Sequence, residues 1–70
     1  MNERKLRGKI VEAGYTHEEL AKEIGIGAWS FSERVNGKKE FLRRELSQLK
    51  KLLHLNEREF IDIFFAEVKD

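Results

Sequence analysis

The chain has 70 residues, of which 39% are charged, and it contains neither cysteine nor proline. This length predicts one small domain spanning residues 1–70, and the absence of cysteine excludes a disulfide framework, a thiolate metal site and a cysteine nucleophile. No apolar run approaches the roughly 18 residues of a membrane span, and no signal-peptide pattern is present, so we expect a soluble, cytoplasmic protein without a membrane partner.

The net charge is only +1, but the charges are unevenly distributed along the chain. Residues 1–55 carry 12 lysines and arginines against 8 acidic residues, whereas residues 56–70 carry 2 against 5. A basic body with an acidic end favours a protein that turns one face toward phosphates and another away from them. A solvated surface of mixed charge is the alternative.

Residues 3–13 are predicted to form the first helix, because Leu6, Ile10 and Ala13 fall on one face and a glycine follows them. A second helix begins at Thr16, which forms a T-x-x-E capping box with Glu19. It ends at residue 25, a glycine, where a left-handed backbone is wanted.

A third helix follows at once. Gly27 is an acceptable N-cap, Phe31 and Val35 form the inward stripe, and the pair Asn36-Gly37 ends the helix. Two short helices joined by a tight glycine turn have the layout of a DNA-binding helix-turn-helix, here over residues 16–37.

Residues 36–42 are predicted to be a loop with Phe41 tucked inward, and residues 43–54 the fourth helix. Arg43 and Arg44 stand at the start of this helix, where positive charge opposes the helix dipole. A bound phosphate would offset that cost, and an ion pair with Glu40 or Glu45 would do the same.

The fifth helix, residues 56–68, opens with a capping box formed by Asn56 and Glu59. Its apolar residues spread around more than one face: Phe60, Ile61, Ile63, Phe64, Phe65 and Val68. Either the core uses a wide stripe, or a second surface is buried in a symmetric dimer, with Ile61, Phe64 and Phe65 as interface candidates.

The expected class is therefore an all-α, compact bundle of five helices without catalytic function. His17 and His54 have no metal-ligand spacing, and the carboxylates are scattered over amphipathic helices. No phosphate-binding loop or nucleophile-elbow motif is present. We expect no metal, no cofactor and no small-molecule substrate.

The segment GIGAWSFSERVNG, residues 25–37, resembles the turn and recognition helix of the phage repressor and Cro family of regulators, also called the XRE family. The resemblance implies a lambda-repressor-like fold. The ending LNEREFIDIFF, residues 55–65, resembles that of small prophage-encoded regulators of Gram-positive bacteria. Both resemblances also imply that the protein is located in a bacterial cell or a phage-infected host.

The resemblance further implies which residues meet DNA. Those that would approach base edges are Ala28, Trp29, Ser32 and Glu33. Those that would contact phosphates are His17, Ser30, Asn36, Lys38 and Lys39, and the start of the fourth helix would add Arg43 and Arg44.

The recognition helix departs from the family pattern, because Ala28 stands where glutamine often pairs with adenine. Trp29 either touches bases, binds a protein partner or is partly buried against the turn. Glu33 either accepts a hydrogen bond from cytosine or forms a plain salt bridge. Arg34 stands where the family often has an apolar residue, and Val35 takes over that role.

The sequence thus predicts a homodimeric transcriptional regulator that binds double-stranded operator DNA and acts by occupying it. One alternative is an antitoxin or antirepressor module that uses the same fold mainly to bind a protein. Another is a structural or designed helical domain whose DNA contacts are vestigial.

Overall fold

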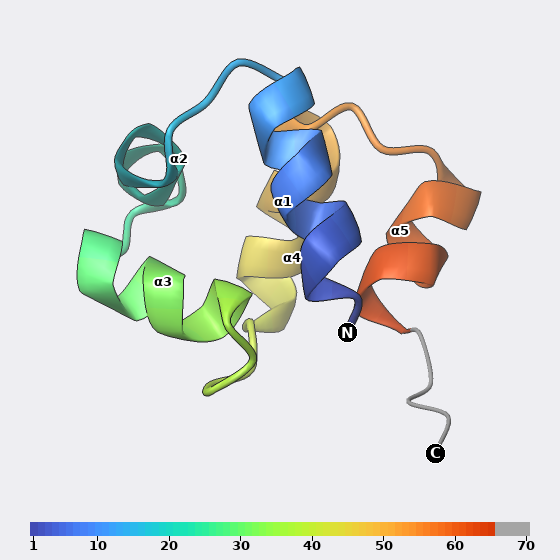
Figure 1. Ribbon diagram of the computed structural model, residues 1–70. Coiled ribbons are helices and arrows are strands. Elements are labelled where there is room, and N and C mark those ends of the chain that lie inside the picture. The colour runs from blue at the N-terminus through green and yellow to red at the C-terminus, as the bar shows by residue number, and fades with distance from the viewer. Residues whose placement is uncertain (66–70) are drawn as a thin grey trace.

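A computed structural model describes residues 1–65, and these form five α-helices with no β-strand (Figure 1). The radius of gyration is 11.2 Å, which matches the roughly 11 Å expected of a compact domain of this length. The predicted all-α class is confirmed for the described part of the chain. The helices are α1 (Glu3–Glu12), α2 (His17–Ile24), α3 (Ala28–Val35), α4 (Arg43–Leu52) and α5 (Glu57–Phe64).

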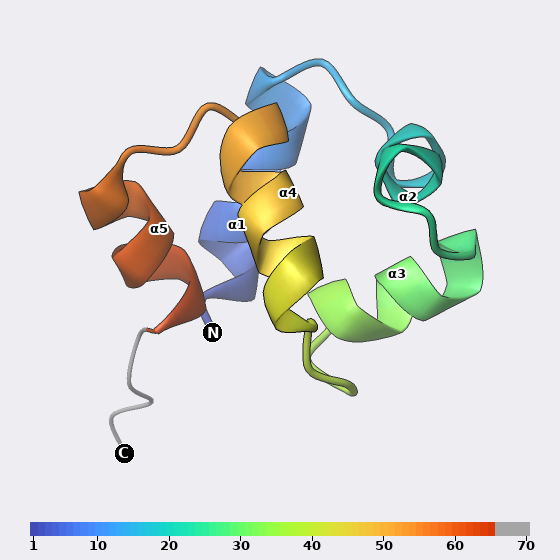
Figure 2. The ribbon, with the colours of Figure 1, turned by 180° about the vertical axis from the view of Figure 1, so that it is seen from behind.

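The helices α1 and α4 occupy the middle of the molecule. The α2–α3 pair lies on one side of them and α5 on the other, in both the front and the reverse view (Figures 1 and 2). Every helix contributes at least one fully buried side chain to a single core. The buried apolar residues are Leu6, Ile10, Leu20, Ala21, Ile24, Phe31, Val35, Leu49, Leu53, Leu55 and Ile63.

The helix starts and stops follow the predicted capping signals closely. Thr16 Oγ1 accepts a hydrogen bond from the Glu19 N–H at 3.1 Å, and the Glu19 side chain accepts one from the Thr16 N–H at 2.9 Å. Gly25 has a φ of 80° and ends α2, and Gly27 caps α3 with extended backbone. Both capping boxes are confirmed, including that of Asn56 and Glu59.

The last helix is shorter than predicted. It ends at Phe64 rather than at residue 68, and the predicted residues 66–68, with Val68, lie outside the described part of the chain. Ile63 is its one fully buried side chain, whereas Phe60 and Phe64 are half-buried against the core. Part of the wide apolar surface of α5 is therefore buried within the molecule.

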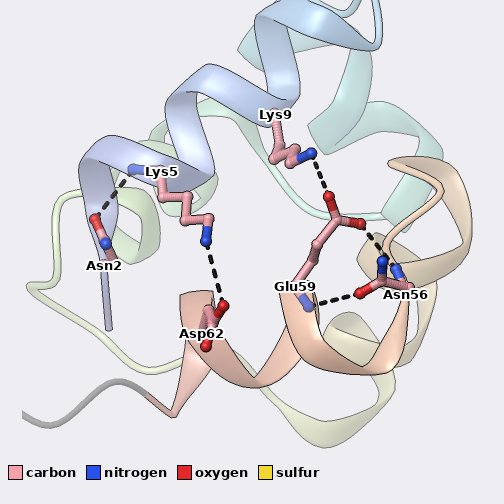
Figure 3. A network of polar contacts seen from close by, with 6 residues as sticks. All are labelled: Asn2, Lys5, Lys9, Asn56, Glu59 and Asp62. Carbon is pink, nitrogen blue, oxygen red and sulfur yellow. Dashed lines mark hydrogen bonds and ion pairs between the residues drawn. The ribbon is translucent and has the colours of Figure 1, made fainter.

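Ion pairs hold α5 against its neighbours (Figure 3). Lys9 Nζ lies 2.5 Å from Glu59 Oε2, and Lys5 Nζ lies 3.4 Å from Asp62 Oδ2. On the α4 side, Lys50 Nζ lies 2.8 Å from a carboxylate oxygen of Glu57. The hydrogen bond between Lys9 and Glu59 is the main reason that the pKa of Glu59 is lowered and the pKa of Lys9 is raised.

We expect Gly25→Ala to destabilise the protein by about 1 kcal/mol, because a side chain disfavours the left-handed backbone at this position. No atom lies within 4 Å of the Cβ that the substitution adds, so the cost is conformational. Gly8→Ala is the matched control. Gly8 lies inside α1 in equally open space, and alanine there should stabilise the helix by roughly 0.5–1 kcal/mol. Urea denaturation measures both values, and shifts of the same sign would contradict this explanation.

The Lys9–Glu59 pair predicts a pH dependence of stability. The lowered pKa of Glu59 means that its contribution is present above the ordinary value of 4.5 and is lost as the pH falls through the lower folded pKa. The raised pKa of Lys9 means that its contribution is present below 10.5 and is lost as the pH rises past the higher folded pKa.

Glu59→Gln isolates this pair, because glutamine can keep the capping hydrogen bond to Asn56 while it removes the charge. The free energy of unfolding of the wild type should exceed that of the variant at pH 7, and the difference should shrink at pH 3. A difference that is the same at both pH values would show that the ion pair contributes nothing.

Candidate nucleic-acid interface

The position of α3 is fixed by its inner face and by the turn that precedes it. Phe31 and Val35 are fully buried, and Ala21 of α2 is small and buried among them in the core. In the turn, the Ile26 N–H donates to the Ala21 carbonyl at 3.0 Å. These contacts leave the opposite face of α3 exposed at its N-terminal end, where Ala28 and Trp29 lie.

The predicted base-contacting residues lie on α3 as expected, but they differ in accessibility. The side chain of Trp29 is 78% exposed, so the alternative of partial burial against the turn is wrong. Ala28 is exposed beside it, whereas Ser32 and Glu33 are half-buried. The outer face of α3 therefore offers an indole ring and a methyl group more openly than it offers a carboxylate.

Glu33 already has a partner. Its carboxylate lies 3.5 Å from Lys39 Nζ, and its side chain is 24% exposed. Its backbone carbonyl also accepts from the N–H groups of Lys38 and Lys39, at 2.9 and 3.4 Å. The salt bridge that was one alternative for Glu33 is thus present, and it holds the Lys39 side chain at the C-terminal end of α3.

A buried carboxylate that sequence reasoning misplaced connects α3 to α4. The Glu45 side chain is fully buried, with Oε1 3.1 Å from Arg34 Nε. The same oxygen accepts a hydrogen bond from the Leu42 N–H at 2.9 Å. The signal was present in the sequence, since a glutamate three residues into a helix often reaches back to the N-cap backbone. Its second partner comes from the preceding helix and could not be identified from spacing.

Of the two alternatives for the start of α4, an ion pair of Glu40 or Glu45 with Arg43 or Arg44 is not formed among the described residues. Glu45 faces Arg34 instead, because it is on the buried side of the helix. Within residues 1–65, neither Arg43 nor Arg44 forms an ion pair, and both side chains are exposed. Their positive charge stays available at the surface.

The remaining predicted phosphate contacts are dispersed around α3. The His17 ring packs edge-on against Phe31, with 5.5 Å between ring centroids, so this half-buried histidine also supports the core. Asn36 is exposed and its side-chain oxygen accepts a hydrogen bond from Arg7 of α1. Ser30 is half-buried, and Lys38 is exposed in the loop.

The predicted dimer residues divide into two groups. Ile61 and Phe65 are 51% and 61% exposed, as an interface on α5 requires. Phe64 is half-buried, and its ring lies 5.9 Å from that of Phe41 and 5.1 Å from that of Phe60. Phe64 therefore contributes to the packing between α5 and the loop and offers an interface less surface than Ile61 and Phe65 do.

A cavity of about 520 Å³ opens beside this aromatic packing. Its walls come from the N-terminus, the loop after α3 and the ends of α4 and α5, and no residue of α3 lines it. The lining residues are Met1, Glu3, Gly37, Lys39, Glu40, Phe41, Leu46, Phe64 and Phe65.

Comparison with models of known protein families, with curated proteins and with solved structures gives no match to this chain. Among the described residues, no helix is long and apolar enough to cross a membrane. Nor does the described part contain a group of three or more histidine, aspartate or glutamate residues able to hold a metal ion.

Proposed function

We propose that residues 16–37 act as a helix-turn-helix within a lambda-repressor-like fold, and that the protein is a transcriptional regulator that binds double-stranded DNA. The observation that carries this proposal is the exposed N-terminal half of the outer face of α3, with Trp29 78% exposed, on a helix whose inward residues Phe31 and Val35 are fully buried. A helix held in this way can enter a major groove without rearrangement of the core.

The distribution of charge supports the proposal. Lys38, Arg43 and Arg44 are exposed near the C-terminal end of α3 and are without carboxylate partners within residues 1–65. The carboxylates of α5 engage lysines of α1 and α4 instead, on the far side of the molecule from α2 and α3 (Figures 1 and 3). Phosphates that approach α3 would meet cations rather than the acidic end of the chain.

The chemistry of α3 limits how it can recognise sequence. Ala28 can contact only a thymine methyl through its side chain, and Trp29 offers an apolar ring with a single donor. Glu33 can accept from cytosine N4 through its free carboxylate oxygen, and a phosphate could draw Lys39 away from the other oxygen. Recognition would thus combine apolar contacts and DNA shape with an exchange of the Lys39 ion pair.

The double variant Lys38→Ala/Lys39→Ala should bind every DNA duplex more weakly than the wild type, because both lysines would contact phosphates. The dependence of log K on log salt should become shallower by about one unit for each lost contact. Trp29, the one tryptophan of the chain, reports binding through its fluorescence. Lys51→Ala combined with Arg58→Ala removes the same charge from exposed positions on α4 and α5 and should leave the slope unchanged. Equal effects of the two double variants would contradict a phosphate-contacting loop.

We further propose a homodimer through the outer side of α5, where Ile61 and Phe65 leave an apolar surface. A single helix-turn-helix module buries little DNA surface, so operators are commonly bound by two copies about one helical turn apart. A dimer of this kind would block polymerase by occupying a pseudo-palindromic site.

Phe65→Lys tests the dimer, because a lysine ammonium opposes burial of this surface while the exposed position tolerates it in the monomer. We expect the variant to remain helical by circular dichroism, to sediment as a monomer and to bind duplex DNA more weakly. A wild type that sediments only as a monomer at high micromolar concentration, with DNA binding unchanged in Phe65→Lys, would rule this interface out.

One observation favours a second candidate function. The outer face of α3 carries an exposed tryptophan, and Ala28, Ser32 and Glu33 stand beside it in place of the glutamine, asparagine or arginine side chains that usually read bases. An antitoxin or antirepressor module could present the same Trp29 to an apolar pocket of a protein partner. The absence of salt-dependent DNA binding by the wild type would favour this candidate.

A further inference from the structure

The arginines and lysines of α1 lie on opposite sides of the helix and behave differently. Lys5 and Lys9 point toward α5 and form ion pairs with Asp62 and Glu59 (Figure 3). Arg4 and Arg7 are three residues apart, so they share another side of the helix. Both are exposed, and neither forms an ion pair within residues 1–65.

Arg7 is also fixed in place beside α3. Its guanidinium donates a hydrogen bond to the side-chain oxygen of Asn36, the residue that caps the C-terminal end of α3. A guanidinium has five N–H donors, so this contact orients the group and leaves other donors free. Asn36 projects from the same outer side of α3 as Glu33, three residues earlier.

We propose that Arg7, supported by Arg4, is a second phosphate-contacting surface on α1, and that it binds the DNA backbone beside the groove that α3 enters. This inference rests on the proposed DNA-binding function and extends the contact surface to a helix outside the helix-turn-helix. A planar guanidinium suits the role, because it can hold a phosphate through two hydrogen bonds while Asn36 holds it from the side.

Two nearby carboxylates oppose the positive charge of these side chains. Glu3 Oε1 lies 3.3 Å from the position that a Cβ would take on Gly37, and Glu40 is exposed in the same loop. Arg4, Arg7 and Lys38 carry three positive charges against these two negative ones. The surface therefore keeps a positive balance on the α1 side of α3.

The test compares Arg7→Ala with Arg58→Ala in the full chain, with salt titrations of binding to a labelled random-sequence duplex. Arg58 is an exposed arginine of α5 without an ion pair in the described part of the chain, so the two variants lose the same charge from different places. For Arg7→Ala we expect the slope of log K against log salt to be shallower by about 0.9. The affinity of this variant should then be about eightfold lower than that of the wild type at 0.1 M salt, and the two affinities should converge near 1 M. Arg58→Ala should match the wild type.

Arg7→Lys separates charge from geometry. It should keep the slope of the wild type but bind more weakly, because an ammonium cannot hold Asn36 and a phosphate in one plane. If the salt dependence of binding is the same for Arg7→Ala and Arg58→Ala while the wild type binds duplex DNA normally, the proposed role of Arg7 is overturned and the proposed DNA-binding function is not. A wild type that does not bind duplex DNA would overturn both this inference and the proposed function.

Discussion

The arrangement of the proposed DNA-binding face depends on one buried carboxylate. Glu45 Oε1 meets Arg34 of α3 and the backbone N–H of Leu42 at the start of α4. The loop that carries Lys38 and Lys39 is therefore anchored at both of its ends by the same group. A buried ion pair of this kind adds little net stability. Separation of the two partners, however, would leave a buried charge without compensation. The pair therefore favours the one arrangement of α3 and α4 in which these two side chains meet.

The cationic side chains fall into two groups, those that form ion pairs within the molecule and those that do not. The lysines Lys5, Lys9 and Lys50 are used within the molecule, because they neutralise the acidic α5 and hold it to α1 and α4. Around α3, Arg34 is paired with Glu45 and Lys39 with Glu33, whereas Lys38, Arg43 and Arg44 form no ion pair within residues 1–65. A net charge of +1 is thus unevenly distributed: lysines neutralise the carboxylates of α5, whereas unpaired cations gather locally in the loop after α3 and at the start of α4.

Local signals were sufficient to predict the helices, whereas tertiary partners were not predictable. The capping boxes at Thr16 and Asn56 and the left-handed Gly25 act over three or four residues, so the sequence reveals them directly. The contact between Arg34 and Glu45 joins two helices across a loop, and the packing of Phe64 on Phe41 joins segments 23 residues apart. Such contacts depend on how the helices cross. The same limit applies to Arg7, whose partner Asn36 lies two helices away.

Amide chemical-shift mapping with a duplex of random sequence tests the central claim most directly, because it locates the bound surface without any substitution. We predict salt-sensitive shifts confined to the start of α2, to α3, to residues 36–39 and to the side of α1 that carries Arg7, with little change at residues 57–59 of α5. Shifts centred on Ile61 and Phe65 with α3 unaffected, or no shifts at low salt, would contradict DNA binding through α3.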